Sequence, residues 1–227
     1  VVGETMTPSL AASFAAAFGE YVNGGRVVVG RDTRPSGEML ERAVVAGLLS
    51  VGCQPLLAGI CPTPSLQIAV AELGVRGGVV ISASHNPPEW NALKFIGGSG
   101  FLLNENEAAE LLDVYNQPDR RFLPEQDLRE ARPAGDLFDL HKKRIFSKID
   151  ADLVRKARLR VAVDCCNGVG AWFSRKFLEE LGCEVFTVFD ERDGIFRRKP
   201  EPVRENLSAL SRAVVENKCA AGFAQDP

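Results

Sequence analysis

The chain has 227 residues, of which 45% are hydrophobic and 25% are charged, and its formal net charge is −3. This length is sufficient for one or two domains with sizeable cores. The nearly balanced charge gives no broad basic surface for nucleic acid or anionic membranes, and no apolar run is long enough to span a bilayer. Six cysteines without dense spacing argue against a disulfide scaffold. We therefore expect a cytoplasmic protein without nucleic-acid or membrane partners.

Helix and strand patterns alternate along the first part of the chain. Thr7-Pro8 and Thr63-Pro64 are typical helix starts, because Thr caps the first turn and Pro suits the first helical position. Ser36 is expected to cap a helix as well. The predicted elements, in chain order, are helix 10–21, strand 26–30, helix 38–50, strand 54–58, helix 66–73 and a strand starting after residues 77–78. This alternation favours an α/β layer architecture.

A domain boundary is predicted near the middle of the chain. A short strand over 92–96, a tight turn at 97–100 and a helix from Asn104 to about residue 115 complete the first domain. Residues 116–135 lose hydrophobic periodicity, and a helix rich in Lys and Arg is predicted over 136–157. We therefore divide the chain into domains 1–135 and 136–227.

The second domain starts again with a strand, over residues 159–165. Residues 26–32 (RVVVGRD) and 160–164 (RVAVD) are alike, and each strand is followed by a helix and a Gly-Cys corner. An internal duplication would explain the likeness, and so would the general similarity of βαβ units. A further strand is predicted over 219–224, and we expect right-handed parallel crossovers.

The most informative segment is residues 79–88, VVISASHNPP, followed by Asn91 and Lys94. An apolar strand ends there in a turn with a hydroxyl, Ser84, and an imidazole, His85, and the carboxyl end of a buried strand is where α/β proteins bind ligands. A serine hydroxyl needs a base, a metal or a positive field to become a nucleophile. His85 could polarise it or pair with a phosphate placed on it, whereas the alternative is a turn without chemistry.

This segment resembles the phosphoserine loop of the α-D-phosphohexomutases, the family of phosphoglucomutase, phosphomannomutase and phosphoglucosamine mutase. By this resemblance Ser84 carries a phosphoryl group that moves between the 1- and 6-positions of a hexose phosphate through a hexose 1,6-bisphosphate. Residues 91–94 (NALK) resemble the family's Asn-Gly-x-Lys, with Ala92 replacing Gly. Lys94 would then act as a general acid/base or steady the transferring phosphate. With His85, these are the expected catalytic residues.

The resemblance also implies a metal site and a fold. Residues 221–227 (AGFAQDP) resemble the strand entering the family's metal loop, D-x-D-x-D-R, so Asp226 and the Ser84 oxygen are expected to bind Mg²⁺. The implied fold is two consecutive three-layer α/β/α units with mostly parallel mixed sheets. We expect the chain to comprise the first domain and most of the second domain of a four-domain enzyme, and to lack turnover alone.

Several other motifs have interpretations that rest on their residue types. The loop over 31–37 (RDTRPSG) places two arginines where they could meet phosphate oxygens, or form a surface Arg-Asp pair; in the family it supports the active-site wall. The glycines of the turn 164–170 (DCCNGVG) are interpreted as tight-turn residues, and the basic triplet 197–199 as a solvated loop. His141 is expected at the surface of a polar helix.

Two other function classes remain open. Ser84 with His85 could serve a phosphatase or other serine hydrolase, although no G-x-S-x-G elbow is present. The chain could also be a non-catalytic sugar-phosphate or nucleotide-binding module. Glucose, mannose and glucosamine phosphates all stay candidate substrates, and the residues indicate no particular oligomeric state.

Overall fold

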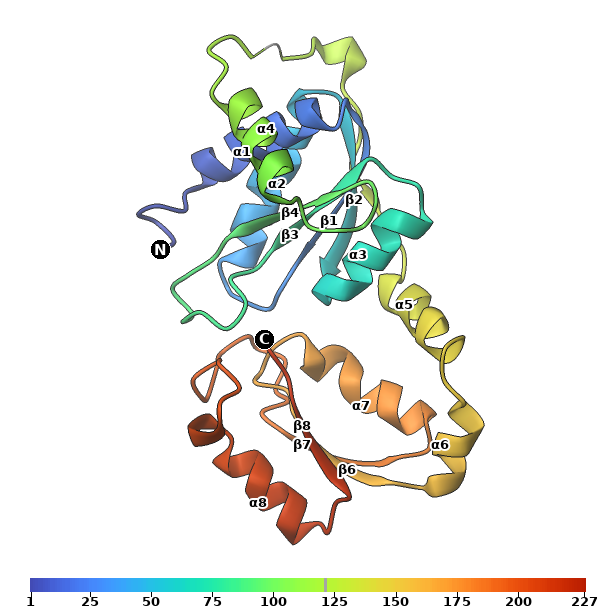
Figure 1. Ribbon diagram of the computed structural model, residues 1–227. Coiled ribbons are helices and arrows are strands. Elements are labelled where there is room, and N and C mark those ends of the chain that lie inside the picture. Colours follow the sequence, from blue (N-terminus) through green and yellow to red (C-terminus); the bar gives the residue numbers. More distant parts are fainter. Residues whose placement is uncertain (121) are drawn as a thin grey trace. The chain divides into compact units, whose positions relative to one another are not determined.

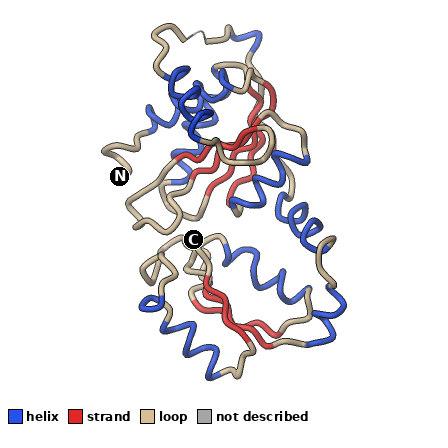
Figure 2. The backbone as a smooth tube through the Cα atoms, viewed as in Figure 1, coloured by secondary structure: helices blue, strands red, loops and turns tan. Residues whose placement is uncertain are grey.

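The computed structural model describes residues 1–120 and 122–227, which form two compact units (Figures 1 and 2). Two short loops that follow strands of the first unit pack with the second. The first unit comprises Val1–Arg31, Ser36–Ser82 and Glu89–His141, and the second comprises Asp32–Pro35, Ala83–Pro88 and Lys142–Pro227. The domain boundary after residue 135 stays a prediction.

The first unit is built on a five-stranded sheet with the order β4-β3-β1-β2-β5. All neighbouring strands pair in parallel except β3 and β4, which are antiparallel. The strands are β1 (Gly25–Arg31), β2 (Cys53–Ile60), β3 (Gly77–Ile81), β4 (Leu93–Gly97) and β5 (Arg132–Pro133). The sheet is therefore mixed and mostly parallel. β5 lies in the stretch 116–135, where the sequence predicted no strand.

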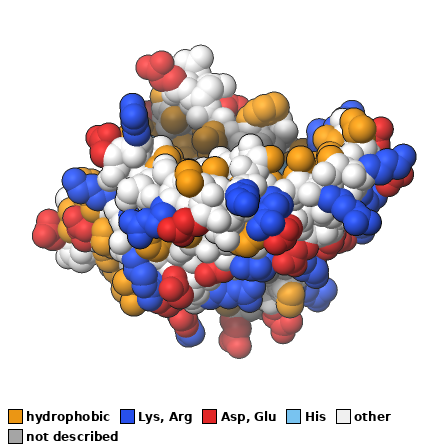
Figure 3. All heavy atoms as spheres, turned by 90° about the horizontal axis from the view of Figure 1, so that it is seen from below, with side chains coloured by type: hydrophobic (Ala, Val, Ile, Leu, Met, Phe, Trp, Pro, Cys, Tyr) orange, Lys and Arg blue, Asp and Glu red, His pale blue; other side chains and the backbone are white. Residues whose placement is uncertain are grey.

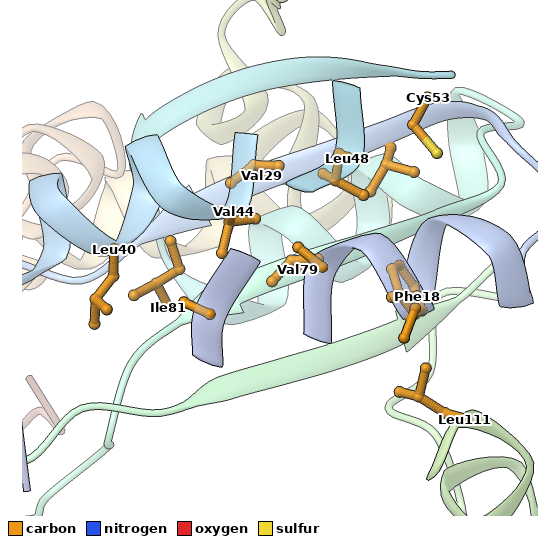
Figure 4. Packing of buried hydrophobic residues seen from close by; sticks show 13 residues of the cluster. Phe18, Val29, Leu40, Val44, Leu48, Cys53, Val79, Ile81 and Leu111 are labelled. Carbon is orange, nitrogen blue, oxygen red and sulfur yellow. The ribbon is translucent and has the colours of Figure 1, made fainter. Parts of the chain in front are cut away.

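Helices cover both faces of this sheet. They are α1 (Pro8–Tyr21), α2 (Gly37–Ser50), α3 (Thr63–Glu72) and α4 (Glu105–Tyr115), with a short 3₁₀ turn η1 (Glu125–Asp127). Alternate strand residues point to opposite faces. Val27 and Val29 pack in one core with Phe18 of α1, and Figure 4 shows this cluster. Val28 packs in another core with Leu66 of α3. The result is a three-layer α/β/α unit.

Not every predicted cap forms as expected. The Thr7 hydroxyl accepts from the Leu10 amide at 3.2 Å, and Asn104 forms a capping box with Glu107. Ser36 occupies the N-cap position of α2, but its side chain does not cap; it accepts from the Asn91 amide group at 3.0 Å. The prediction that Ser36 caps the helix is therefore wrong, because a tertiary contact uses its hydroxyl.

The second unit repeats this layering on a smaller scale. Its sheet has three parallel strands in the order β7-β6-β8, namely β6 (Arg160–Asp164), β7 (Glu184–Val188) and β8 (Ala221–Ala224). The remaining elements of the chain are α5 (Leu137–Phe146), α6 (Ala151–Ala157), α7 (Gly170–Glu180), α8 (Ser208–Glu216) and the 3₁₀ turn η2 (Arg204–Asn206). Val161 and Ala171 share one core, and Ala162 packs with Leu210 in the other. Helices α7 and α8 thus cover opposite faces.

The single helix predicted over 136–157 is wrong, because the structure has two helices there, α5 and α6. The Asp150 carboxylate accepts from the Leu153 amide at 3.0 Å and starts α6 as its N-cap. An Asp that bonds to the backbone in this way competes with continuation of the preceding helix.

Two general properties of the surface can be stated. None of the helices in residues 1–120 and 122–227 combines the length and apolar character needed to cross a membrane. On the face shown in Figure 3, acidic and basic side chains are interspersed. On this face the distribution fits the small net charge of −3.

Candidate active site

The expected serine lies in a strained loop after β3. Ser84 has φ +56°, in the left-handed region that non-glycine residues rarely adopt. The Asn86 amide donates to the Ala83 carbonyl at 3.1 Å and closes a tight turn around it. Such a conformation persists only where the surroundings hold it, and it is typical of functional loops. The loop therefore presents the Ser84 side chain in one defined direction.

The residues expected at the serine loop and the end of β8 lie together. The Ser84 hydroxyl donates to Asp226 Oδ2 at 2.5 Å, and His85 Nδ1 lies 3.9 Å from Asp226 Oδ1. The side chains of His85 and Asp226 are 52% and 46% exposed, so a ligand can reach them. Three of the four expected site residues thus form one cluster within the second unit.

The order of the groups in this cluster bears on the chemistry. In a serine-hydrolase triad the imidazole lies between the serine and the carboxylate. Here the Asp226 carboxylate lies between Ser84 and His85, because its two oxygens face different partners. This order does not favour a hydrolase in which His85 is the base. It favours a site in which the hydroxyl and the carboxylate act together.

Arg34 is fully buried beneath this loop. It is 1% exposed, and its Nε donates to Asp32 Oδ2 at 3.1 Å. Its terminal nitrogens donate to the carbonyl oxygens of Ser84 at 2.6 Å, Asn86 at 2.8 Å and Pro87 at 2.6 Å. The Arg-Asp pair that was one of the two alternatives for this loop therefore exists, but it is buried and not at the surface.

A second segment packs on Arg34. The Phe196 ring lies 5.1 Å from the guanidinium carbon, a cation–π distance. Gly194, two residues earlier, has φ +69°, and a Cβ there would overlap the Thr33 carbonyl oxygen. Thr33 in turn donates through its hydroxyl to the Asn167 carbonyl at 3.1 Å. We call residues 193–200 the strap.

The strap also contains a second buried ion pair. Arg198 Nε lies 2.9 Å from Asp164 Oδ2, and these side chains are 6% and 0% exposed. Its terminal nitrogens donate to Pro200 O at 2.8 Å and Gln225 O at 3.2 Å. The interpretation of residues 197–199 as a solvated loop is therefore wrong for Arg198, because its guanidinium is paired inside the unit.

The glycines of the turn after β6 serve close packing. Left-handed backbone occurs at Cys166 and Asn167, both with φ +50°. A Cβ on Gly168 would overlap the Pro227 backbone, and one on Gly170 would overlap the Gln225 side chain. These two glycines therefore let the turn approach the end of β8 that carries Asp226.

Lys94 and Asn91 belong to the first unit. Lys94 lies on β4 opposite Val80, next to the end of β3 that leads into the serine loop. Asn91 is 5% exposed, and its side chain bonds to Ser36 and to the Ala92 amide. The side chain of Asn91 is therefore structural, and Lys94 stays an expected site residue.

A groove runs beside the serine loop. Its volume is about 770 Å³, and its walls are residues 85–88 of the loop together with strap residues 196–200 and residues 201 and 206. Arg197 and Lys199 give this wall positive charge, although Arg197 also pairs with Asp193 at 2.7 Å. The hydrogen bond with Arg197 lowers the pKa of the Asp193 carboxyl to about 2. The groove combines apolar lining with a partly cationic wall, and His85 is one of its lining residues.

The cluster offers oxygen ligands of the kind that Mg²⁺ prefers. The Ser84 and Asp226 oxygens are 2.5 Å apart and partly exposed, and both are hard donors. Within the described residues, no group of three or more His, Cys, Asp or Glu side chains could hold a metal ion. The two oxygens therefore fit part of a magnesium site.

Burial raises the pKa of Cys165 to about 12 and of Cys166 to about 11, so these thiols stay protonated.

Arg34, Arg198, Gly194 and Phe196 are site-supporting residues whose roles the sequence did not reveal. Asp32 and Arg34 are only two residues apart, which is a usable local signal for a pair. Arg198 lies 34 residues from Asp164, and no local pattern links them.

Comparison with known families decides the relationship. The model of the phosphoglucomutase/phosphomannomutase alpha/beta/alpha domain I matches residues 1–122, and that of domain II matches residues 139–227. The chain belongs to the phosphoglucomutase/phosphomannomutase family. The resemblance read from the serine loop is thereby confirmed, and so is the mixed α/β fold.

Individual relatives of the family agree. The chain is 38% identical over 226 residues to a probable phosphoglucosamine mutase of Methanopyrus kandleri, covering 99% of this chain and 49% of that protein. It is 39% identical over 234 residues to a phosphoglucosamine mutase of Carboxydothermus hydrogenoformans, covering 100% and 52%. The structure of a putative phosphomannomutase from Thermus thermophilus superposes with a TM-score of 0.86 at 28% identity, covering 100% and 52%. The chain spans about half the length of the curated relatives it matches.

Proposed function

We propose that this chain carries the phosphoserine site of a phosphohexomutase, which moves a phosphoryl group between the 1- and 6-positions of a hexose phosphate. The observation that supports this most directly is the hydrogen bond from the Ser84 hydroxyl to Asp226. It joins the loop that resembles the family's phosphoserine loop to the residue that resembles the first aspartate of its metal loop. The names of the relatives support a mutase, and phosphoglucosamine mutases are among them.

The proposed reaction has two phosphoryl transfers. In the charging step, the Ser84 oxygen bonds to phosphorus of a hexose 1,6-bisphosphate while the bond from that phosphorus to the sugar oxygen breaks. The serine proton ends on the departing sugar oxygen, which leaves phosphoserine and a hexose monophosphate. In turnover, phosphoserine gives its phosphate to the free hydroxyl of a hexose monophosphate. The bisphosphate so formed reorients and returns its other phosphate to Ser84, so the net change is an isomerisation.

Each expected site residue has a proposed role in these steps. Asp226 accepts the hydrogen bond of Ser84 and thereby directs the nucleophilic oxygen. His85, whose ring is half exposed beside the groove, pairs with the phosphate on Ser84. Lys94 acts as a general acid/base or steadies the transferring phosphate, as in the family it resembles. Phosphoryl transfer depends on this positioning and charge neutralisation more than on covalent help.

The Ser84 and Asp226 oxygens would hold part of the Mg²⁺ coordination shell. When bound, the cation would neutralise negative charge on the phosphate oxygens. The six free cysteines of the described residues also support the proposed cytoplasmic location, where thiols stay reduced.

Phosphate transfer to Ser84 tests the proposal. The protein is expressed at its natural length and incubated with ³²P-labelled hexose 1,6-bisphosphate. The labelled residue is then identified by peptide mass spectrometry. We expect stable label on Ser84, no label in Ser84→Ala, and retained label in Ser82→Ala, a control two residues away. Interconversion of glucose, mannose and glucosamine phosphates is then measured on the same samples. A phosphatase would release inorganic phosphate, and a binding module would take up none. Full mutase activity of Ser84→Ala would overturn the proposal.

A further inference from the structure

Two buried arginines are held in the same way, each by an aspartate at the end of a different strand. Asp32 follows β1 directly and pairs with Arg34, and Asp164 ends β6 and pairs with Arg198. Each carboxylate also accepts from the backbone amide two residues on, at 3.0 Å for Arg34 and 2.9 Å for Cys166. Each guanidinium is therefore neutralised and fixed at its Nε side. Its terminal nitrogens are directed elsewhere.

The terminal nitrogens of the first arginine fix the backbone of the serine loop. Nη2 of Arg34 donates to the carbonyl oxygens of both Ser84 and Asn86, and Nη1 donates to that of Pro87. Three carbonyls bound by one planar cation restrict the loop to one conformation, and donors on a charged group make strong hydrogen bonds. These hydrogen bonds from Arg34 therefore stabilise the left-handed backbone of Ser84.

The second arginine does the same for the residue before Asp226. Nη2 of Arg198 donates to the Gln225 carbonyl, and the Gln225 amide donates to the Asp164 carbonyl at 3.0 Å. Both backbone polar groups of Gln225 are thus bound to the Asp164–Arg198 pair. The direction in which the chain delivers Asp226 is fixed at the preceding residue.

The strap connects the two pairs. Phe196 covers the guanidinium of Arg34, and Arg198 is only two residues further along the same segment. At its start, Gly194 approaches the Thr33 backbone closely enough to exclude any Cβ. A shift of the strap would therefore disturb both arginines together.

We propose that Arg34 and Arg198 are a matched pair of positioning residues that set the separation between the Ser84 hydroxyl and the Asp226 carboxylate. Both are too deeply buried to bind a sugar phosphate: Arg34 is 1% exposed, and the Arg198 side chain is 6% exposed. They act on the reaction through the backbone of the reacting groups. Misplacing a reacting group by about 1 Å can cost roughly a hundredfold in rate.

This inference rests on the proposed function and is tested with Arg34→Lys and Arg198→Lys. Lysine keeps the charge but cannot bind a carboxylate and several carbonyls in the planar arrangement of a guanidinium. The matched controls are Arg42→Lys, at an exposed Glu38 pair, and Arg155→Lys, at an exposed Asp152 pair of the second unit. In every experiment the protein is expressed at its natural length.

Single-turnover labelling of Ser84 by a hexose 1,6-bisphosphate separates positioning from binding. For both variants we expect the maximal rate to fall at least about tenfold, with the half-saturating concentration within about twofold of wild type. Both controls should keep the wild-type rate. In the double variant the loss should be smaller than the product of the single losses, because both act on one separation. A wild-type rate in either single variant, or a raised half-saturating concentration at unchanged rate, would overturn the inference.

Hydrogen exchange at the Asn86 amide gives a readout that needs no activity. This amide closes the serine turn, so Arg34→Lys should speed its exchange, whereas Arg42→Lys should not. If wild type takes up no phosphate, the proposed function fails, while unchanged Asn86 exchange in Arg34→Lys would overturn the positioning role by itself. If Arg34→Lys does not fold, Phe196→Leu replaces it, since it leaves every hydrogen bond of Arg34 in place. It should slow labelling about threefold, and an unchanged rate would count against the inference.

Discussion

The Ser84 hydroxyl lies 2.5 Å from Asp226 Oδ2, although 142 residues separate the two in the chain. The contact joins a loop after β3 to the residue that follows β8 by two positions. Neither side chain is deeply buried, so the position of the hydrogen bond depends on the contacts that fix the backbone of the serine loop and the backbone before Asp226. The first two predictions address the charge of this pair and the packing beneath it.

Replacing Asp226 by Asn tests the charge at the site. An amide still accepts the Ser84 hydrogen bond, but it is a neutral and poor ligand for a hard cation. We expect Asp226→Asn to lower the rate of Ser84 labelling by about a hundredfold and to raise the Mg²⁺ concentration needed for half-maximal labelling. Titration of the labelling rate with MgCl₂ measures both effects, and chelation of the cation should slow wild type.

The control for this change is Asp193→Asn, which alters an exposed carboxylate paired with Arg197. Its labelling rate should stay within about twofold of wild type, because exposed ion pairs contribute little. Equal Mg²⁺ titrations for Asp226→Asn and wild type would remove Asp226 from the metal site.

Gly194→Ala should destabilise the protein for two separable reasons. Alanine at φ +69° is strained, and its Cβ would overlap the Thr33 carbonyl oxygen. Gly59 has a similar φ of +61° with no atom within 4 Å of an added Cβ, so Gly59→Ala shows the strain alone. We expect roughly 1–2 kcal/mol lost in Gly59→Ala and roughly 1–3 kcal/mol more in Gly194→Ala. Urea unfolding measures both, and equal losses would show that the close approach contributes nothing.

Much of the fold could be predicted because its signals are local. The β-branched runs around Val28 and Val80 and the Thr7-Pro8 start each indicate an element from neighbouring residues alone. The break between α5 and α6 was missed because Asp150 reads as an ordinary polar residue within a charged helix. Its side chain can bond to the backbone and end a helix, but the same residue type also occurs on the exposed face of a continuous helix.

The site was predictable to the extent that its chemistry is written in short motifs. Ser84 and His85 stand in one loop, whereas Arg34 acts on carbonyls 50 to 53 residues away, and carbonyl partners leave no trace in a sequence. Residue type gives no sign of the burial of Arg34 either, because arginine is usually exposed. Only the fold shows that Asp32 and Asp164 neutralise the arginines and permit their burial.

Thiol reactivity should follow burial among the cysteines. Burial raises the pKa of Cys61 and Cys165 to about 12 and of Cys53 to about 11, so very little thiolate forms in the folded state. Cys219 is only partly buried. At about pH 8 we expect iodoacetamide to modify Cys219 of the folded protein before the buried thiols. In urea, which unfolds the protein, all of these thiols should react at similar rates. Peptide mapping over time measures the order, and early modification of Cys61 would contradict it.

His141 should make stability depend on pH, contrary to its expected place at the surface. Its Nδ1 lies 2.9 Å from the Ser65 hydroxyl, a residue that is 0% exposed, and Phe138 packs edge-on against the ring. Burial lowers the pKa of His141 from 6.5. Above that value both folded and unfolded chains carry neutral His141, and its contribution to stability is fully present. As the pH falls from 6.5 through the folded-state pKa, the unfolded chain binds more protons, so stability is lost.

The measurement is the free energy of unfolding in urea from about pH 7.5 to about pH 5, for wild type and His141→Gln. Glutamine keeps a polar partner for Ser65 but does not titrate, so its profile should fall less steeply across this range. Parallel profiles for wild type and His141→Gln would show that the Ser65 contact does not couple protonation to folding.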